Sequence, residues 1–492
     1  MSQHFDVIIL GGRLSAVITA ALLAKRGLRG LLVDQGELAS MDAGLFYDLA
    51  TVPSGSPVME AVYRELGLES ELPKKGRPLS PILQVVLPDQ RLDLSPDRAH
   101  FLAELERGFG AAAQPVKAIL DRWTSLEAEE GQYLSAAGEL PAAGFFARRT
   151  ADAALRKHEF LGQSLTEAQL FAGLPPLLAE LFLAPLPFLT HFDARRPDEV
   201  KTARFLRPLL RMMRGLHRLD GSKGARGLFL EAIASRSFEV RRSAAESVEP
   251  GGKQVLVRLA GQREPVSAEV LIDASADLSG LDVVPNNLRK KDFAQVIQSV
   301  KPKGFLHTLS LEIDEAVVPP GLGEQALLLN GRRDPTRYDL SDPDAEDRPI
   351  WLTRRPSIDE ARVQLVASHP VSTVRAHAQS LDHLEEVMRA RIERLIPFLM
   401  DGHPEIHALS GASAIKHKQP VLPHPLYDLA LDPRTGLTGV GTQTGWKNVL
   451  VAGPTVLPGL GAEGEYLSAI QAADQTGALI GGGKKKRTLA SV

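Results

Sequence analysis

The chain contains no cysteine among its 492 residues. This absence excludes disulfide bonds, thiolate metal sites and a cysteine nucleophile. The sequence also lacks an uninterrupted apolar run long enough to span a bilayer. Its first apolar run is short and leads straight into a helical pattern, unlike a signal peptide. Together these absences predict a cytoplasmic protein.

An excess of charge of either sign is also lacking. The formal net charge is −3, and the composition of 44% hydrophobic and 24% charged residues is that of an ordinary soluble globular protein. This balance gives no reason to expect a nucleic acid as partner. The length is sufficient for two or more domains with sizeable cores.

Several motifs of known chemistry are missing. There is no P-loop pattern G-x-x-x-x-G-K-[ST] and no G-x-S-x-G nucleophile elbow. His403 and His407 are four positions apart, but Pro404 lies between them and no H-E-x-x-H pattern exists, so we predict no metal site. The sequence identifies no catalytic acid, base or nucleophile.

What the sequence does contain is a β-α-β pattern at its start. Residues 5–10 (FDVIIL) form a short apolar run typical of a buried parallel strand. Residues 14–26 are apolar nearly all round, which predicts a buried helix. Residues 31–33 predict a second strand, with Asp34 at its end. An acidic residue roughly 20 positions after a glycine turn is the layout of a dinucleotide-binding crossover.

The glycine turn departs from the usual G-x-G-x-x-G/A spacing, because residues 11–16 read GGRLSA. Gly11, followed by Gly12, suits the tight turn, and Ala16 permits close packing of helix and strand. Arg13 stands where a second glycine would let the backbone approach a pyrophosphate. Three alternatives remain open: Arg13 obstructs that approach, its guanidinium pairs with phosphate, or the unit serves only as a scaffold.

Two later segments are unusually apolar or basic. Residues 165–192 are strongly apolar but interrupted by prolines, which excludes one long helix and favours short helices that line an apolar cavity. Residues 205–218 (FLRPLLRMMRGLHR) mix apolar and basic positions. They predict either a basic amphipathic surface that touches a membrane or a domain helix whose arginines face water or internal acids. Glu127, Glu129 and Glu130 are interpreted as a solvated helix face.

The middle of the chain is rich in strand patterns. Residues 239–275 alternate apolar and polar positions between turns, which predicts a three-stranded antiparallel meander that leads into a buried strand at 270–273. Beyond it, the sequence predicts two strands of a second sheet, at 304–313 and 362–368. It also predicts an exposed charged loop at 332–348 and a long helix at 372–399.

The C-terminal region predicts a strand, a glycine-rich loop and a helix in succession. Residues 448–452 (NVLVA) form a buried-strand pattern that Gly453 ends. Residues 457–465 (LPGLGAEGE) predict the loop, and residues 466–479 an alanine-rich helix. Such a corner suits anions or carbonyl groups because a helix N-terminus presents unpaired N–H groups. A basic tail, GGGKKK, follows the helix and is expected to be mobile.

Taken in order, these segments resemble the FAD-dependent amine-oxidase and phytoene-desaturase superfamily. The resemblance rests on the β-α-β unit, the turn and helix at 221–234, the meander, and the run NVLVAGPTVLPGLGAEGEYLSAIQAA at 448–473. It implies an α/β fold, with a FAD/NAD(P)-binding Rossmann-like domain of the glutathione-reductase and amine-oxidase type and a second α+β substrate domain. We assign the first domain to 1–80, 215–290 and 440–492, and the second, cavity-forming domain to 81–214 and 291–439.

The resemblance also implies a cofactor and the residues that hold it. In that superfamily the opening turn holds the FAD pyrophosphate, and the acidic residue after the second strand holds the adenosine ribose. The C-terminal glycine loop approaches the flavin ring and its ribityl chain. Carried over by position, the cofactor-binding residues are Gly11, Gly12, Arg13, Ala16, Asp34, Gly453, Gly461, Glu463, Gly464 and Glu465.

Three positions depart from the superfamily pattern. Arg13 is the first, residues 35–40 (QGELAS) lack the arginine expected after Asp34, and Pro454 replaces a polar residue. Two functions are therefore predicted. The first is a FAD-dependent oxidoreductase that acts on an apolar substrate by hydride transfer. The second is a pseudoenzyme that keeps the fold and binds a lipid or isoprenoid ligand or a protein partner.

Overall fold

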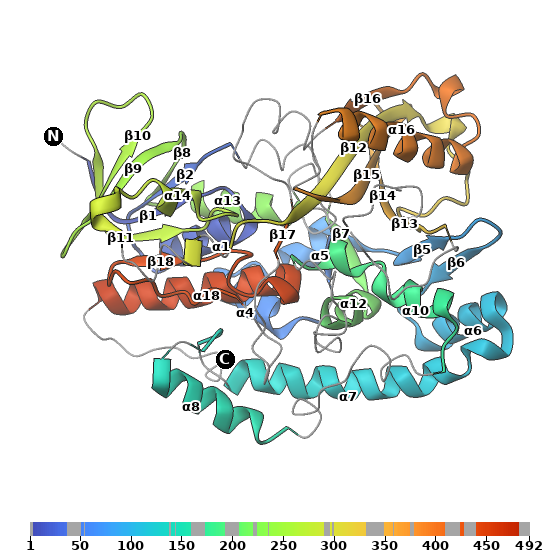
Figure 1. Cartoon of the computed structure of the whole chain (residues 1–492), viewed down its shortest axis with the longest axis horizontal. Coiled ribbons are helices and arrows are strands. Elements are labelled where there is room, and N and C mark those ends of the chain that lie inside the picture. The colour runs from blue at the N-terminus through green and yellow to red at the C-terminus, as the bar shows by residue number, and fades with distance from the viewer. Residues whose placement is uncertain are drawn as a thin grey trace.

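The computed structural model in Figure 1 describes most of the chain in separate stretches. These are residues 3–36, 51–53, 55–136, 139–142, 144–158, 173–191, 206–219, 224–234, 236–289, 296–297, 300–330, 349–357, 359–373, 378–408, 424–427 and 439–481. The predicted charged loop, the turn before residue 224 and the basic tail after residue 481 lie outside them, as do residues 165–172 of the apolar segment.

One sheet gathers strands from both ends of the chain. Its parallel strands, in spatial order, are β8, β2, β1, β11 and β18 (Phe238–Arg242, Gly30–Asp34, His4–Leu10, Val266–Asp273 and Val449–Val451). β10 (Val255–Leu259) pairs antiparallel with the first half of β11, and β9 (Ala245–Pro250) pairs with β10. The strands predicted at 5–10, 31–33 and 448–452 are confirmed.

The antiparallel meander begins one strand later than predicted. β8 does not join it but pairs in parallel with β2, where Leu31 lies opposite Glu239. The helix α13 (Gly224–Ala234) precedes β8. It brings the chain to the end of the sheet at which β2 also begins, because parallel strands start at the same end. The meander therefore consists of β9, β10 and β11.

Helices from both chain ends cover this sheet. Every residue of α1 (Leu14–Lys25) from Leu14 to Ala24 is buried, which confirms the predicted buried helix. α18 (Gly461–Ile480), α13 and α4 (Pro57–Leu66) pack against it. α18 begins five residues earlier than predicted, so Glu463 and Glu465 belong to a helix. Glu463 in the first turn favours this start, because an acid there complements the helix dipole.

A second sheet is mainly antiparallel. Its order is β16, β12, β15, β14, β13, β5 and β6 (Glu405–Ala408, Gly304–Asp314, Arg362–Ser372, Ile350–Pro356, Gln325–Leu328, Leu83–Val86 and Arg91–Leu94), with β17 (Pro425–Leu426) also on β12. The two predicted strands, β12 and β15, pair along their whole length. A small third sheet contains β3, β7 and β4 (Thr51–Pro53, Leu216–Leu219 and Gly76–Pro78).

The remaining helices surround these sheets, and Figure 1 shows α7 and α8 along one edge of the molecule. Short helices α10 and α11 occupy the described part of the proline-interrupted segment, as predicted. α12 is shorter than the basic stretch 205–218, because Gly215 at φ +131 follows it and β7 begins directly afterwards. The bounds are α5 Glu71–Lys75, α6 Arg98–Phe109, α7 Pro115–Ala136, α8 Gly144–Leu155, α10 Pro176–Leu183, α11 Leu186–Leu189, α12 Leu206–Met213, α14 Ser279–Asp282 and α16 Ala378–Leu395.

The result is a mixed α/β fold with parallel and antiparallel sheets, as predicted. The division into two domains with the assigned boundaries stays a prediction. Within the described stretches, no helix is both long and apolar enough to cross a membrane.

Candidate functional site

The parallel strands of the first sheet end at a crowded corner. Gly11 follows β1 and Gly453 follows β18, each with φ +115, a conformation that glycine tolerates best. A Cβ on Gly11 would lie 2.8 Å from the carbonyl oxygen of Ala274, just after β11. A Cβ on Gly453 would lie 3.4 Å from Oγ of Ser15. The ends of three strands and the start of α1 therefore pack directly against one another.

The N-terminus of α1 binds a carboxylate from the far end of the chain. The backbone N–H of Ser15 donates a hydrogen bond to Oε2 of Glu465 over 3.1 Å. The first N–H groups of a helix have no partner within the helix and lie at the positive end of its dipole, so they bind anions. Glu465, near the start of α18, supplies that anion.

Two histidines that the sequence analysis does not single out lie beside this carboxylate. Nε2 of His191 lies 3.3 Å from Oε1 of Glu465, and its Nδ1 lies 3.2 Å from the carbonyl oxygen of Pro425. The ring of His424 lies 4.3 Å from that of His191, and its Nε2 donates to the carbonyl oxygen of Thr190 over 2.6 Å. We call Arg13, Ser15, His191, His424 and Glu465 the Glu465 cluster.

Arg13 supplies the positive charge of the Glu465 cluster. Arg13 directly precedes α1 and is only 2% exposed. Burial raises the pKa of Glu465, but the hydrogen bond from His191 and the charge of Arg13 outweigh burial and hold that pKa at about 2. Burial lowers the pKa of both histidines, and the charge of Arg13 adds to this effect. The cluster thus keeps the Glu465 carboxylate charged beside the guanidinium of Arg13.

The start of α18 is also closed by the chain itself. A Cβ on Gly461 would lie 1.9 Å from the carbonyl oxygen of Leu189, and a Cβ on Gly464 would lie 2.3 Å from that of Leu457. The N–H of His191 donates to the carbonyl oxygen of Pro458 over 2.8 Å. α11 and the residues after it therefore lie directly on the helix start that the resemblance assigns to the flavin.

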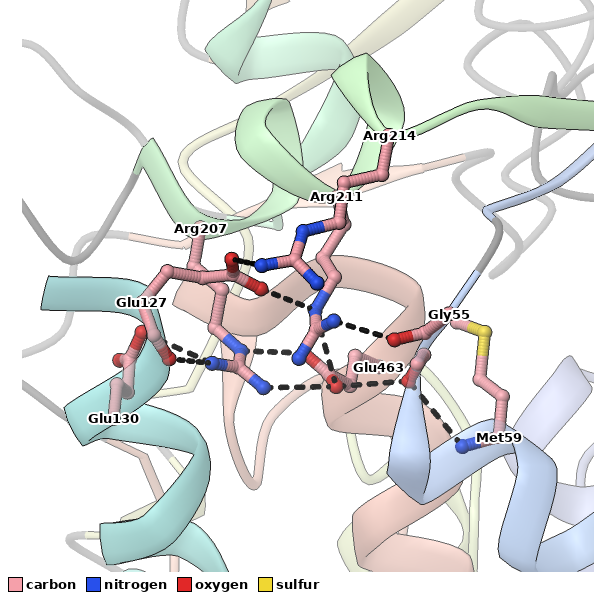
Figure 2. Close-up of polar contacts among 9 residues, drawn as sticks. Gly55, Met59, Glu127, Glu130, Arg207, Arg211, Arg214 and Glu463 are labelled. Carbon is pink, nitrogen blue, oxygen red and sulfur yellow. Dashed lines mark hydrogen bonds and ion pairs between the residues drawn. The ribbon is translucent and has the colours of Figure 1, made fainter. Parts of the chain in front are cut away.

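Glu463, two positions before Glu465, belongs to a second buried group (Figure 2). Nε and Nη2 of Arg207 donate to its two carboxylate oxygens over 2.6 and 3.0 Å. The hydroxyl of Ser56, which caps α4, donates to Oε1 over 2.8 Å. Burial raises the pKa of Glu463, but the charge of Arg207 outweighs it, and the net pKa is lowered. Glu463 thereby joins α18 to α12 and α4.

Two acids of α7 complete this group. Nε of Arg211 lies 3.0 Å from Oε1 of Glu127, and Nη1 of Arg207 lies 3.5 Å from Oε2 of Glu130. Nη1 of Arg211 donates to the carbonyl oxygen of Gly55 over 2.5 Å. We call Ser56, Glu127, Glu130, Arg207, Arg211 and Glu463 the Glu463 network.

The Glu463 network corrects one prediction. Glu127 and Glu130 are each 3% exposed, so the interpretation as a solvated helix face is wrong for these two residues. The reason is that α12 places Arg207 and Arg211 opposite them, and buried charges require such partners. These two arginines face internal acids, which is the second of the two interpretations given for residues 205–218. Membrane contact through 165–218 stays a prediction.

The other predicted site residues are likewise buried. Asp34 ends β2, and its Oδ1 accepts a hydrogen bond from the N–H of Gly36 over 3.1 Å. Gly12 and Ala16 are buried at the start of α1. The structure brings six of the ten predicted residues together at that helix start and three on the first turn of α18, whereas Asp34 lies at the end of β2. The cofactor contacts assigned to all ten stay predictions.

Asp273 is a further residue that the sequence analysis misses. It ends β11, where Oδ1 accepts hydrogen bonds from the N–H and hydroxyl of Ser275 over 3.0 and 2.5 Å. Oδ2 accepts from the N–H of Leu281 over 2.8 Å. Burial raises its pKa to about 7 even though these hydrogen bonds oppose the shift. The one sequence signal that could have indicated Asp273 is its place directly after the apolar run VLI, because Asp34 likewise follows an apolar run.

As arranged, this corner does not fit a pyrophosphate group. The anion-binding N–H of Ser15 already carries the Glu465 carboxylate. A diphosphate brought to the same N–H would meet that carboxylate at close range, and two like charges repel strongly in a buried site. The glycine that normally permits backbone approach is Arg13 here.

No protein-family model matches the chain, and neither does any curated protein. Solved structures match it over nearly its full length. Putrescine oxidase bound to putrescine superposes with a TM-score of 0.59 at 13% identity, over 98% of this chain and 100% of that one. Cyclohexylamine oxidase from Brevibacterium oxydans has a TM-score of 0.53 at 16% identity, over 97% and 99%.

A fatty acid isomerase from P. acnes matches equally well. Its TM-score is 0.58 at 11% identity, over 96% of this chain and 97% of that one. At such low identities the likeness shows the fold alone. The chain has the fold of these amine oxidases and of this isomerase, and the resemblance predicted from the sequence is confirmed at that level.

Proposed function

We propose that this chain is an oxidoreductase-like protein that keeps the amine-oxidase fold without holding FAD, and that it binds a lipid-like apolar ligand. The observation that carries the proposal is the hydrogen bond from the Ser15 N–H to the Glu465 carboxylate. In a dinucleotide-binding crossover, that helix N-terminus is the pyrophosphate site. Here the chain supplies its own anion.

The Glu465 carboxylate takes the place that a pyrophosphate would occupy, and its burial in the Glu465 cluster holds it there. Glu465 is 1% exposed, its pKa is about 2, and Arg13 provides the balancing charge, so the carboxylate stays ionised and paired at any physiological pH. Expelling it would leave the Ser15 N–H at the start of α1 without its anion. An incoming dinucleotide would have to offset that loss as well as the cost of moving a buried side chain.

The second support is steric. Leu189 contacts the first turn of α18 so closely that Gly461 has no room for a Cβ. In the superfamily that the sequence resembles, this turn approaches the flavin ring. A ring system of that size requires residues 186–191 to move away from α18, which breaks the hydrogen bond between His191 and Pro458.

The ligand class is proposed from the apolar helices on the other side of this corner. α10 and α11 are buried and bring aromatic side chains together, with Phe182 5.0 Å from Trp123 and Phe188 5.5 Å from Trp351 between ring centroids. The sequence predicts that this segment lines an apolar cavity. Among the structures that share the fold, one is a fatty acid isomerase. A protein partner is the alternative to such a ligand.

A second candidate is a FAD-dependent oxidoreductase that acts on an apolar substrate. Two observations favour it: full-length likeness to two amine oxidases, and an acidic residue, Asp34, at the end of β2. If FAD bound, it would supply the hydride chemistry, and Asp34 would hold the adenosine ribose.

The deciding experiment is a visible absorbance spectrum of the purified full-length protein, followed by analysis of the supernatant for flavin after denaturation. We expect no flavin, either as purified or after incubation with excess FAD. Stoichiometric FAD would contradict the proposal and support the oxidoreductase.

Two variants test whether the Glu465 cluster is the cause. Arg13→Gly restores the glycine spacing, and Glu465→Ala removes the internal anion. If the double variant binds FAD and the natural protein does not, these two residues block the site. If the double variant folds and still fails to bind, the incompatibility is spread over further residues. Release of fatty acids or isoprenoids on denaturation, read by mass spectrometry, tests the ligand class separately.

A further inference from the structure

The surface formed by α8 carries two exposed aromatic residues. α8 lies at the outer edge of the molecule beside α7 (Figure 1), and its Ala151 and Ala154 are buried. At its start, Phe145 is 72% exposed and Phe146 80% exposed. Their rings meet edge to face, 5.5 Å apart between centroids. They are the two most exposed large apolar residues in the described part of the chain.

The charged residues of α8 and of the two positions after it are nearly all positive. Arg148, Arg149, Arg156 and Lys157 are exposed on the same helix or just after it, and Asp152 is the only carboxylate between them. Within the described stretches none of the four cations forms an ion pair. The chain as a whole has a net charge of −3, so this basic segment is a local feature and does not reflect the overall composition.

We propose that α8 docks the protein on an anionic bilayer surface, with the rings of Phe145 and Phe146 inserted at the headgroup boundary. An interfacial anchor combines aromatic residues that enter the acyl boundary with basic residues that contact anionic headgroups. The aromatic pair and the four cations of α8 supply both parts. Ala151 and Ala154 fix the opposite face of the helix to the protein, so the anchor is held rigidly.

The size of the exposed apolar area favours a bilayer over a protein partner. Two phenylalanine side chains offer roughly 300 Å² of apolar surface. A stable protein interface buries about 800 Å² on each partner and is depleted of charge at its core. Beyond the two rings, α8 presents cations, which suit lipid phosphates.

The experiment is co-sedimentation of the full-length protein with vesicles. One set contains phosphatidylglycerol mixed with phosphatidylcholine, and the other contains phosphatidylcholine alone. We expect binding to the first set, at least tenfold weaker binding to the second, and loss of binding as salt is raised. Equal binding to both sets, or no binding to either, overturns the proposal.

Two variants assign the binding to α8. Phe145→Ser with Phe146→Ser should reduce vesicle binding at least tenfold, and Arg148→Gln with Arg149→Gln should reduce it by about fivefold for each charge removed. The matched control is Phe398→Ser, which removes a ring that is 64% exposed outside α8 and should change nothing. Because all these side chains are exposed, we expect unchanged thermal unfolding. Binding that persists in the Phe145/Phe146 variant overturns the proposal.

A fluorescent probe reports insertion directly. Phe146→Trp places an indole at the position of the most exposed phenylalanine of α8. The three natural tryptophans lie outside α8: Trp123 and Trp351 are 1% and 3% exposed, and Trp446 is partly buried. We expect a blue shift with anionic vesicles and quenching by brominated lipid. Should sedimentation instead reveal a dimer that the double serine variant abolishes, with no vesicle binding, the surface is a protein interface and the proposal is wrong.

Discussion

Ser15 and Glu465 are 450 positions apart in the sequence and are joined by a hydrogen bond of 3.1 Å in the structure. The contact links the start of α18, the last helix that the structure describes, to the start of α1, the first. Because the acceptor is a buried carboxylate with a strongly lowered pKa, its protonation is linked to folding.

The first prediction concerns acid stability. The folded pKa of Glu465, about 2, lies below its ordinary value of 4.5. The unfolded chain therefore takes up the proton first as the pH falls. The stability from this carboxylate is complete above about pH 4.5 and is lost towards pH 2. Glu465→Gln should lower the free energy of unfolding by about 3 kcal/mol at pH 7 and by progressively less in acid.

Urea unfolding between pH 3 and pH 7 measures this difference. The control is Glu69→Gln, because the Glu69 side chain is 60% exposed and pairs with an exposed partner, Arg64. That change should alter stability by about 1 kcal/mol or less. A Glu465→Gln difference that is constant with pH would contradict the assigned pKa.

The second prediction concerns Asp273 and has the opposite sign. Its folded pKa of about 7 lies above the ordinary 3.8, so the folded state holds the proton more tightly than the unfolded chain. Stability from this group is complete below pH 3.8 and falls as the pH rises to 7. Relative to Asp273→Asn, the natural protein should lose about 3 kcal/mol between pH 5 and pH 8.

This difference is read from urea midpoints of the two proteins at each pH. Asp121→Asn serves as the control, since the Asp121 side chain is 58% exposed. Parallel pH profiles for the natural protein and Asp273→Asn would show that Asp273 titrates normally.

The third prediction uses two glycines of one helix. Gly461→Ala places a Cβ 1.9 Å from the carbonyl oxygen of Leu189 on a backbone with φ +54, so it should destabilise the protein by on the order of 3 kcal/mol. Gly477→Ala meets nothing within 4 Å and should stabilise it by up to about 1 kcal/mol, because alanine favours a helix. Thermal unfolding of both variants tests the pair. Similar melting temperatures would refute the close contact between α18 and residues 186–191.

The fourth prediction concerns the Glu463 network. Glu463→Gln leaves Arg207 buried with less compensating charge, which should cost about 3 to 5 kcal/mol. Adding Arg207→Met removes the uncompensated charge and should recover part of that loss. Chemical denaturation of the single and double variants gives the coupling energy. Purely additive effects would mean that the two residues do not interact.

The sequence predicts the strands of the first sheet well, because buried parallel strands are marked by short apolar runs that glycines end. β1 and β18 follow this pattern, whereas β2 ends at Asp34. It does not predict which charged residues are buried. Glu127 in isolation looks like part of a solvated helix, and only the approach of Arg211, from α12, makes the burial of its carboxylate favourable.

The sequence predicts which residues belong to the candidate site, but it does not predict which of them contact one another. The resemblance places Glu465 near a cofactor, and the structure places it at the N-terminus of α1. No local pattern could reveal that pairing, since it depends on β1 and β18 flanking β11 in one sheet. His191 and His424 were missed for the same reason: each is a lone histidine in an apolar context, and only the packing of residues 424–427 against residues 190–191 brings them together.

The arrangement of the first sheet has a consequence during protein synthesis. β1 and α1 leave the ribosome before β18, which completes that sheet, and α18, which covers that helix. At about 5 to 20 residues per second, the apolar surface of α1 waits on the order of a minute for its cover. Because exposed apolar surface makes an incomplete chain prone to aggregate, we expect a fragment that stops before residue 449 to be less soluble than the full chain.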